Sequence, residues 1–225
     1  MKSKYLTLTF LLLVLSLPKA FGQETHSSPA MDEILVDDKL LIDRYTERYS
    51  QLDKTDIYAT IENEATSPFQ TAAALRVLKQ QFIPEAISKE KNYIERLLLR
   101  CLNRTESAFV EVEAMHALVI LDRYKYFKSL VPALIRKLDH YNDAVSSLAF
   151  DSLDKIIQDN THRAREAKII FSTMRKILFL SRNRLVLVKE PSNKLKQKLT
   201  LLRWSIKVLG TQMLDQLPPE VIRLL

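Results

Sequence analysis

The sequence predicts an all-α fold, an α-solenoid of about four antiparallel helix pairs that wind as a right-handed superhelix. Three observations lead to this prediction. Glycine occurs only twice in 225 residues, which argues against a fold built on glycine-dependent hairpins. From Met31 onward, apolar residues recur at helical spacing between brief polar breaks. Several of these helices also repeat one apolar pattern, as the units of a solenoid do.

The first 22 residues have the pattern of a secretory signal peptide. Lys2 and Lys4 form a basic start, residues 5–17 are apolar, and the small residues Ala20 and Gly22 predict cleavage after Gly22. An apolar stretch of 13 residues is shorter than the roughly 20 that a membrane-spanning helix needs, which favours a cleaved signal over an uncleaved anchor. The sequence therefore predicts a secreted or periplasmic protein, without a lipid-attachment cysteine at the cut and without a transmembrane segment after signal removal.

Residues 23–30 are polar and predict a disordered linker, and residues 31–225 predict a single helical domain. The clearest helix start is Ser67-Pro68-Phe69-Gln70, with a capping serine, proline at the first helical position and glutamine three residues after the cap. It predicts a helix to about residue 81. Apolar spacing predicts the other helices at 31–50, 55–65, 85–102, 106–123, 127–139, 143–158, 164–181, 193–210 and 219–225.

One apolar pattern recurs along the chain at a displacement of 35 residues: Val110, Ala114, Leu118 and Leu121 correspond to Val145, Ala149, Leu153 and Ile156. Its last two positions recur earlier as Leu75 and Leu78, and later as Ile206 and Leu209. This recurrence predicts repeats at roughly 54–82, 85–123, 127–160 and 164–210, with the helices 31–50 and 219–225 as caps.

One of these units resembles a HEAT repeat. Its first helix, 130–139, contains Pro132 and ends in Asp139 at the turn, and its second helix carries the Val…Ala…Leu ladder that starts at Val145. The family usually places an arginine directly after that valine, where this chain has Ser146. The resemblance implies helical hairpins that stack as a solenoid, with the second helix of each pair on the inner surface.

The sequence offers no recognisable catalytic set, so we expect no enzyme activity, no cofactor and no metal. Phosphate-binding loops, dinucleotide fingerprints and the G-x-S-x-G elbow all need glycines that the chain lacks. His116 lies in a predicted helix without a second ligand at metal-binding spacing. Glu111 and Glu113 are two residues apart and do not share a helix face. Asp151 and Asp154 do share one, and we expect them to be solvated.

Two further residues have both a structural and a functional interpretation. Cys101 is the single cysteine and stands in an apolar helical context, where a thiol behaves as a small buried hydrophobe. Asn103 begins an Asn-Arg-Thr glycosylation sequon, while Thr105 of the same sequon would equally serve as the N-cap of the next helix.

Charge is distributed unevenly along the chain. Residues 24–162 contain 17 basic and 23 acidic side chains, whereas residues 163–207 contain 13 basic and two acidic ones. The basic segment predicts either a solubilising surface or the binding of an anionic partner, and head-to-tail self-association is also open. Export disfavours nucleic acid, so an acidic protein, an anionic polymer or lipid head groups are the expected partners.

The candidate binding residues lie on the predicted helix 193–210. Lys196, Arg203 and Lys207 share one face, apart from an expected buried stripe of Leu195, Leu199, Leu202, Ile206 and Leu209. Trp204 is either a core tryptophan covered by residues 217–225 or an exposed aromatic in the binding surface. The sequence thus predicts an exported, non-enzymatic binding or scaffold protein. The alternative is an enzyme with a pocket on the inner helices.

Overall fold

The computed structural model describes residues 31–122, 125–158 and 164–225. The predicted signal peptide, the cleavage after Gly22 and the linker 23–30 lie outside the described residues. The chain divides into two units, Met1–Lys39 and Leu40–Leu225. In the first unit the structure describes the start of α2 (Met31–Tyr49), and the remainder of α2 and all later helices belong to the second.

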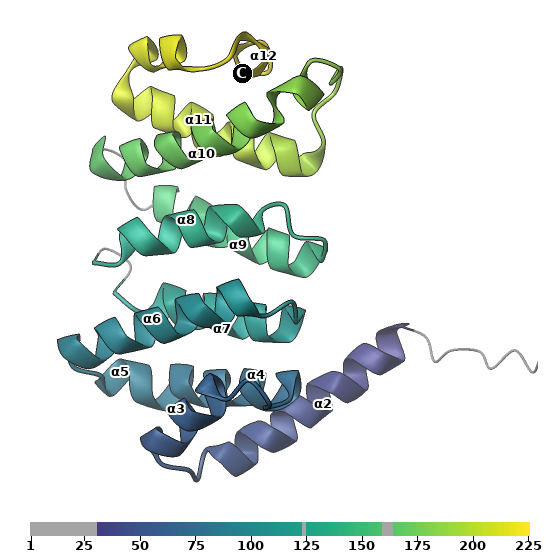
Figure 1. Cartoon of the computed structure of the whole chain (residues 1–225), viewed down its shortest axis with the longest axis vertical. Helices are drawn as coiled ribbons and strands as arrows, with labels where there is room; N and C mark the ends of the chain where they lie inside the picture. The colour runs from purple at the N-terminus through teal and green to yellow at the C-terminus, as the bar shows by residue number, and fades with distance from the viewer. Residues whose placement is uncertain (1–30, 123–124, 159–163) are drawn as a thin grey trace, which may run out of the picture. The chain divides into compact units, whose positions relative to one another are not determined.

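The described residues form an all-helical protein and contain no strand (Figure 1). After α2 come α3 (Lys54–Glu62), α4 (Pro68–Val77), α6 (Ser88–Arg104), α7 (Ala108–Ile120), α8 (Phe127–Lys137), α9 (Asp143–Gln158), α10 (Ala164–Leu185), α11 (Asn193–Leu209) and α12 (Pro219–Ile222). Three short elements join them, namely the π-helix η1 (Leu78–Phe82), α5 (Ile83–Glu85) and the 3₁₀-helix η2 (Thr211–Gln216).

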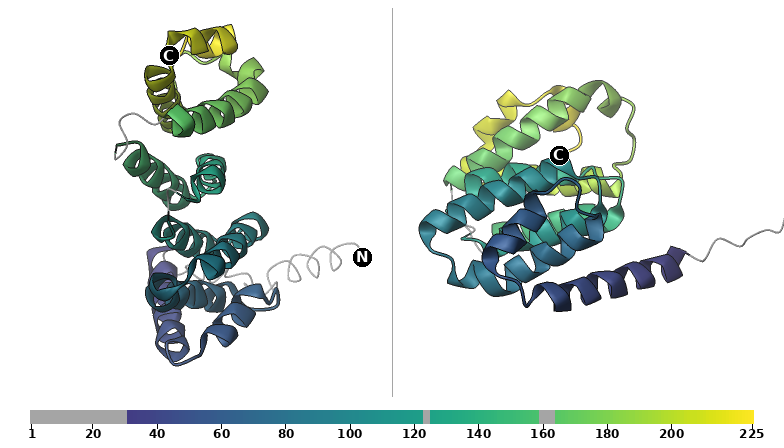
Figure 2. Two further views of the ribbon diagram at one scale, coloured as in Figure 1. Left: turned by 90° about the vertical axis from the view of Figure 1, so that its left-hand side faces the viewer. Right: turned by 60° about the horizontal axis from the view of Figure 1, so that its bottom comes forward.

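The second unit is built from consecutive helices packed as neighbours. Helix α3 packs on α4, α6 on α7, α8 on α9 and α10 on α11, and Figure 2 shows the same pairing from two further sides. Between pairs, α7 packs on both α4 and α9, α9 packs on α11, and α8 packs on α10. Both members of a pair therefore contribute to the joins between pairs.

The predicted helix start at Ser67 is confirmed. The Ser67 hydroxyl accepts a hydrogen bond from the Gln70 N–H at 3.3 Å, and the Gln70 side chain accepts one from the Ser67 N–H at 3.3 Å. Pro68 occupies the first helical position, where a missing N–H costs nothing. The expected continuation to residue 81 is present but changes character, because the backbone becomes a π-helix at Leu78.

The repeated apolar pattern forms the core of the central pairs. All eight residues of its two best copies are 3% exposed or less: Val110, Ala114, Leu118, Leu121, Val145, Ala149, Leu153 and Ile156. Burial of each valine, leucine or isoleucine side chain contributes about 1.5–3 kcal/mol. The alanines at the second position allow the helix axes to approach closely. The prediction that these apolar residues recur at helical spacing on the buried face of their helices is therefore confirmed.

Helix ends differ from the prediction at several places. The helix predicted at 164–181 continues to Leu185, because the apolar spacing of Met174 and Leu178 extends to a further buried residue at its end. The segment predicted as a helix at 219–225 is a helix only over Pro219–Ile222, and the 3₁₀-helix before it was not predicted. The N-cap position of α7 is Ser107 rather than Thr105, and the Ser107 side chain makes no capping hydrogen bond. The Thr105 hydroxyl accepts a hydrogen bond from the Ser107 N–H at 3.1 Å.

The buried face of α11 is rotated relative to the predicted stripe. Leu199 and Leu202 are buried as expected, but Leu195, Ile206 and Leu209 are only half-buried. The structure buries Lys198, Leu201 and Ser205 in addition. The two polar members of this face are satisfied, because Lys198 binds the Asp139 carboxylate and the Ser205 hydroxyl donates to the Leu201 carbonyl at 2.9 Å.

Candidate functional site

Two buried glutamates on α7 join this helix to the end of α4 on one side and to the end of α8 on the other. Glu113 is 7% exposed, and its carboxylate lies 2.7 Å from Arg76 and 2.8 Å from Lys79, both from the preceding helical segment. Burial lowers the pKa of Arg76, but the hydrogen bonds and charges of Glu113 and Asp43 outweigh this effect and raise it above its usual value. Glu113 thus holds a desolvated ion pair between α4 and α7.

Glu111 faces the other neighbour. Its side chain is 1% exposed, and Oε1 accepts a hydrogen bond from the Lys137 ammonium at 2.6 Å. Oε2 receives no hydrogen bond of good geometry, although Nε2 of His140 lies 2.8 Å from it. Glu111 and Glu113 therefore point to different helices, as their spacing of two predicts, and each is held by cations of another element.

The polar side chains of His116, His140, Asp151 and Asp154 differ in their exposure to solvent. The His140 side chain is only 10% exposed and contacts Glu111 just after the end of α8. Asp151 is exposed and Asp154 half-buried, and Asp154 accepts a hydrogen bond from Gln158 in the next turn. His116 is exposed on α7. Within the described ranges, histidine, cysteine, aspartate and glutamate side chains form no group of three that could hold a metal.

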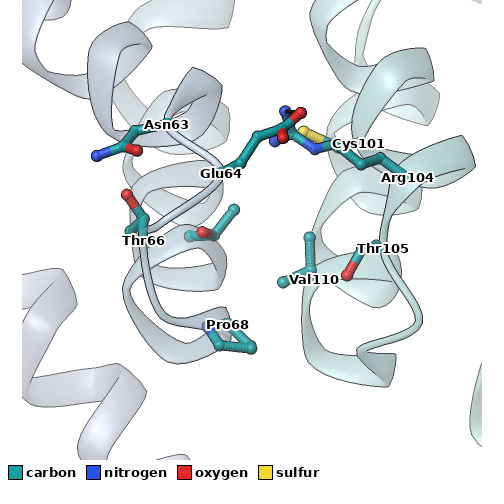
Figure 3. A pocket seen from close by; sticks show the side chains of 9 residues that line it. Asn63, Glu64, Thr66, Pro68, Cys101, Arg104, Thr105 and Val110 are labelled. Carbon is teal, nitrogen blue, oxygen red and sulfur yellow. Dashed lines mark hydrogen bonds and ion pairs between the residues drawn. The ribbon is translucent and has the colours of Figure 1, made fainter.

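A pocket of about 280 Å³ opens between the α3–α4 and α6–α7 pairs (Figure 3). Arg104 and Glu64 lie at its edge and form an ion pair at 3.2 Å, and Arg104 also donates to the Ile61 carbonyl at 3.0 Å. Cys101 is 2% exposed, and burial raises the pKa of its thiol. The thiol is thus kept protonated and the arginine is neutralised, so the charged and nucleophilic groups of this pocket are already engaged.

The basic segment presents most of its cations to solvent. Among the described basic residues of 165–207, Lys194 and Lys198 pair with carboxylates, namely Asp143 and Asp139. The others form no ion pair with a described residue, and all of them except the half-buried Arg182 are exposed: Arg165, Lys168, Arg175, Lys176, Arg184, Lys189, Lys196, Arg203 and Lys207. The cause is compositional, since the segment has two acidic residues to share among them.

A basic groove of about 470 Å³ lies between α8 and α10. The exposed cations Lys128, Arg165 and Lys168 line it, together with Pro132, Ile169, Ser172 and Thr173. The Ser172 and Thr173 hydroxyls donate to the carbonyls of Lys168 and Ile169 in their own helix, at 2.7 and 2.9 Å. The cations are thus the free donors of the groove, and its described lining residues include no carboxylate. We call this site the α8–α10 groove.

The four predicted binding residues all lie on α11, but they are not equivalent. Lys196 and Lys207 are exposed, and their ammonium groups form no hydrogen bond or ion pair with a described residue. Arg203 is exposed as well, but its guanidinium donates to the carbonyls of Leu225 and Leu224, both at 3.0 Å. Trp204 is half-buried against the apolar core. Arg203 therefore anchors the segment that follows α12, which leaves Lys196 and Lys207 as the available cations of this face.

Sequence reasoning missed the α8–α10 groove. Lys128 belongs to the half of the chain with more acidic than basic residues, and 37 positions separate it from Arg165. Only the packing of α8 on α10 brings them together. The groove could have been predicted from the repeat pattern, because the first helices of successive pairs in a solenoid are expected to lie side by side.

No known protein family, curated protein sequence or solved structure matches this chain.

Proposed function

We propose that this protein is an exported, non-enzymatic binding protein that holds an anionic partner through its basic C-terminal half. The supporting observation is the set of exposed cations on α10 and α11 that have no carboxylate partner among the described residues. Export rests on the signal-like pattern of the first 22 residues.

We also propose that the helix pairs form a HEAT-like, right-handed α-solenoid. The packing between pairs supports this arrangement, because α4, α7, α9 and α11 follow one another as neighbours. In such an array each unit contacts its neighbours only, and sequence order becomes spatial order. The acidic and basic halves of the chain would then be spatially separate.

The lysines and arginines of the chain differ in whether a carboxylate lies close enough to form an ion pair. Before residue 158, lysines and arginines are paired in several places, for example Lys54 with Glu90 at 2.7 Å and Arg100 with Glu62 at 2.9 Å. In the α8–α10 groove, Lys128, Arg165 and Lys168 converge without such a partner. Converging like charges repel each other, so an anion in the groove would lower the free energy of the site.

The alternative function, an enzyme with a pocket on the inner helices, would have to use the polar groups of α4, α7, α9 and α11. The buried carboxylates there, Glu111 and Glu113, are each engaged by two cationic or basic side chains. These contacts favour a structural role that joins helix pairs, which in turn favours the binding function.

Binding to immobilised poly-L-glutamate tests the proposal. We expect the purified chain to bind and to lose affinity as sodium chloride is raised, because exposed charges are screened over about 8–10 Å near physiological ionic strength. The double variant Arg165→Glu, Lys168→Glu should lose at least about tenfold in affinity, since each reversal replaces an attraction by a repulsion.

The matched control is Lys89→Glu, Lys155→Glu, which changes the net charge equally at exposed positions of α6 and α9. It should bind within about twofold of the unmodified chain if the groove matters. Equal losses in both double variants would show a non-specific effect of net charge, and salt-independent binding would show that charge does not drive the interaction. Either result would contradict the proposal.

A further inference from the structure

The outward face of the C-terminal half of α10 and the turn that follows it expose apolar side chains to solvent. Phe179 and Val186 are each 49% exposed, and Leu180 and Leu187 are each 84% exposed. Leu180 lies on α10, whereas Val186 and Leu187 lie in the turn that follows the last helical residue, Leu185. Large apolar side chains that are this exposed, gathered in one short stretch of the chain, are typical of a contact site.

Cations surround these apolar side chains. Arg175 and Lys176 stand one turn before them, and together with Phe179, Leu180 and Gln216 they line an open hollow of about 500 Å³. The Arg182 guanidinium lies 4.2 Å from the centre of the Phe179 ring. The sequence contains no acidic residue between Glu166 and Glu190. The whole face is therefore both apolar and positively charged.

The end of this face is held in place from outside α10. The Arg223 guanidinium donates to the carbonyls of Leu185, Val186 and Val188, at 2.9, 3.1 and 3.3 Å. The Leu185 carbonyl ends α10 and also accepts a hydrogen bond from the Val188 N–H at 3.1 Å, and the other two carbonyls belong to the turn that follows. Arg223 thus fixes the turn on which Leu187 projects, so the apolar tip is presented by ordered backbone.

We propose that this face docks on the surface of an anionic lipid bilayer. The apolar side chains of Phe179, Leu180 and Leu187 would enter the interface, and Arg175, Lys176, Arg182 and Arg184 would contact the head-group phosphates. The inference rests on the proposed function, since it names the anionic partner. A flexible anionic polymer would engage the cations but give the exposed leucines no apolar surroundings, whereas a bilayer interface offers both together.

The charge of this face and the length of its basic side chains fit a bilayer surface. Long arginine and lysine side chains extend toward phosphates while their aliphatic stems lie beside apolar groups, as at membrane interfaces. The arrangement is a surface contact, and among the described residues no helix is long and apolar enough to cross a membrane.

Flotation of the chain from Gln23 onward, which lacks the predicted signal peptide, with two kinds of vesicle tests the inference. We expect binding to vesicles of phosphatidylglycerol and phosphatidylcholine in equal parts, and little binding to phosphatidylcholine alone. The double variant Leu180→Ser, Leu187→Ser should reduce binding to the anionic vesicles at least about tenfold, because it removes two side chains from the interface. Ile87→Ser with Ile120→Ser is the matched control, since both isoleucines are exposed elsewhere, at 68% and 53%.

A second measurement reports insertion directly. The fluorescence of a Leu187→Trp variant, corrected for the native Trp204 by subtracting the spectrum of the unmodified chain, should shift to the blue with anionic vesicles. The same variant bound to poly-L-glutamate should show no shift. Because Leu187 is exposed, these substitutions should leave thermal unfolding unchanged.

The outcomes separate the two proposals. The Leu180→Ser, Leu187→Ser variant is the decisive one. If it binds both poly-L-glutamate and anionic vesicles as well as the unmodified chain does, the bilayer inference is overturned and the proposed function stays in place. Equal binding to both kinds of vesicle would overturn the anionic requirement of the inference. Failure to bind either probe would overturn both proposals.

Discussion

The Glu113 carboxylate lies 2.7 Å from the Arg76 guanidinium, across the packing of α7 on α4. The two residues are 37 positions apart, and their side chains are 9% and 22% exposed. Lys79 binds the second carboxylate oxygen at 2.8 Å. The contact therefore joins two helix pairs through groups that water reaches poorly.

Removing this carboxylate should destabilise the protein strongly. Glu113→Gln leaves Lys79 without a carboxylate and Arg76 with only the partly exposed Asp43, so we expect a loss toward the lower end of the about 3–5 kcal/mol that breaking a buried pair from one side costs. Urea unfolding followed by circular dichroism measures the change. Glu47→Gln, at an exposed position of α2, is the control and should change stability by less than about 0.5 kcal/mol. A small effect of Glu113→Gln would show that the pair is not desolvated as described.

Substitution of Arg203 should destabilise the protein, whereas substitution of the two lysines on the same face, Lys196 and Lys207, should not. Arg203→Ala removes hydrogen bonds to the Leu224 and Leu225 carbonyls, and we expect a loss of about 1–2 kcal/mol in unfolding free energy. Lys196→Ala with Lys207→Ala should leave stability unchanged, because neither ammonium forms a hydrogen bond or ion pair with a described residue. Thermal unfolding distinguishes them. Equal melting temperatures for all variants would contradict the anchoring role of Arg203.

Cys101 should be unreactive in the native state. Its side chain is 2% exposed, and burial raises the pKa of the thiol, so the nucleophilic thiolate is both scarce and inaccessible. A thiol-reactive chromophore should label the folded protein far more slowly than the protein in concentrated urea. Fast labelling of folded protein would show that the pocket beside Cys101 opens readily.

His116 should make stability depend on pH. The His116 ring lies at the surface, but partial desolvation by the protein around it, and then the nearby charge of Lys79, lower its pKa below 6.5 in the folded state. The unfolded chain then binds this proton at higher pH than the folded one, so stability decreases as the pH falls below 6.5 toward the folded-state pKa. His116→Gln should flatten this part of the profile. Unfolding free energies measured from neutral pH downward test the effect, and an unchanged profile would refute it.

The sequence predicted the helices well because their signals are local. A capping serine at Ser67, apolar residues at helical spacing and a displaced copy of one pattern are all visible within short windows. The π-helix that begins at Leu78 was not predictable in this way. Its residues are ordinary helix formers, and no local feature distinguishes a wider turn from a normal one.

Buried charges were the main failure of sequence reasoning. Glu111, Glu113 and Lys198 belong to the interior, although their residue types favour the surface. Each is stabilised by a partner that is distant in sequence, 59 positions away for Lys198 and Asp139. The cation that binds Asp139 is Lys198 of α11. A HEAT repeat has an arginine at the position after Val145, but in this chain that position is the buried Ser146. Periodicity within one helix cannot reveal such pairings.

The contact between Arg76 and Glu113 also makes the helix pairs non-interchangeable. When Leu75 is aligned with Leu118 in the repeated pattern, Val119 takes the place of Arg76 and Asp122 that of Lys79. A second copy of the α6–α7 pair, stacked directly after the first, would therefore set its own buried glutamate against a valine and an aspartate. Duplicating the middle of the chain would therefore leave a buried carboxylate without its cations, so the charges at this contact favour one order of the helix pairs.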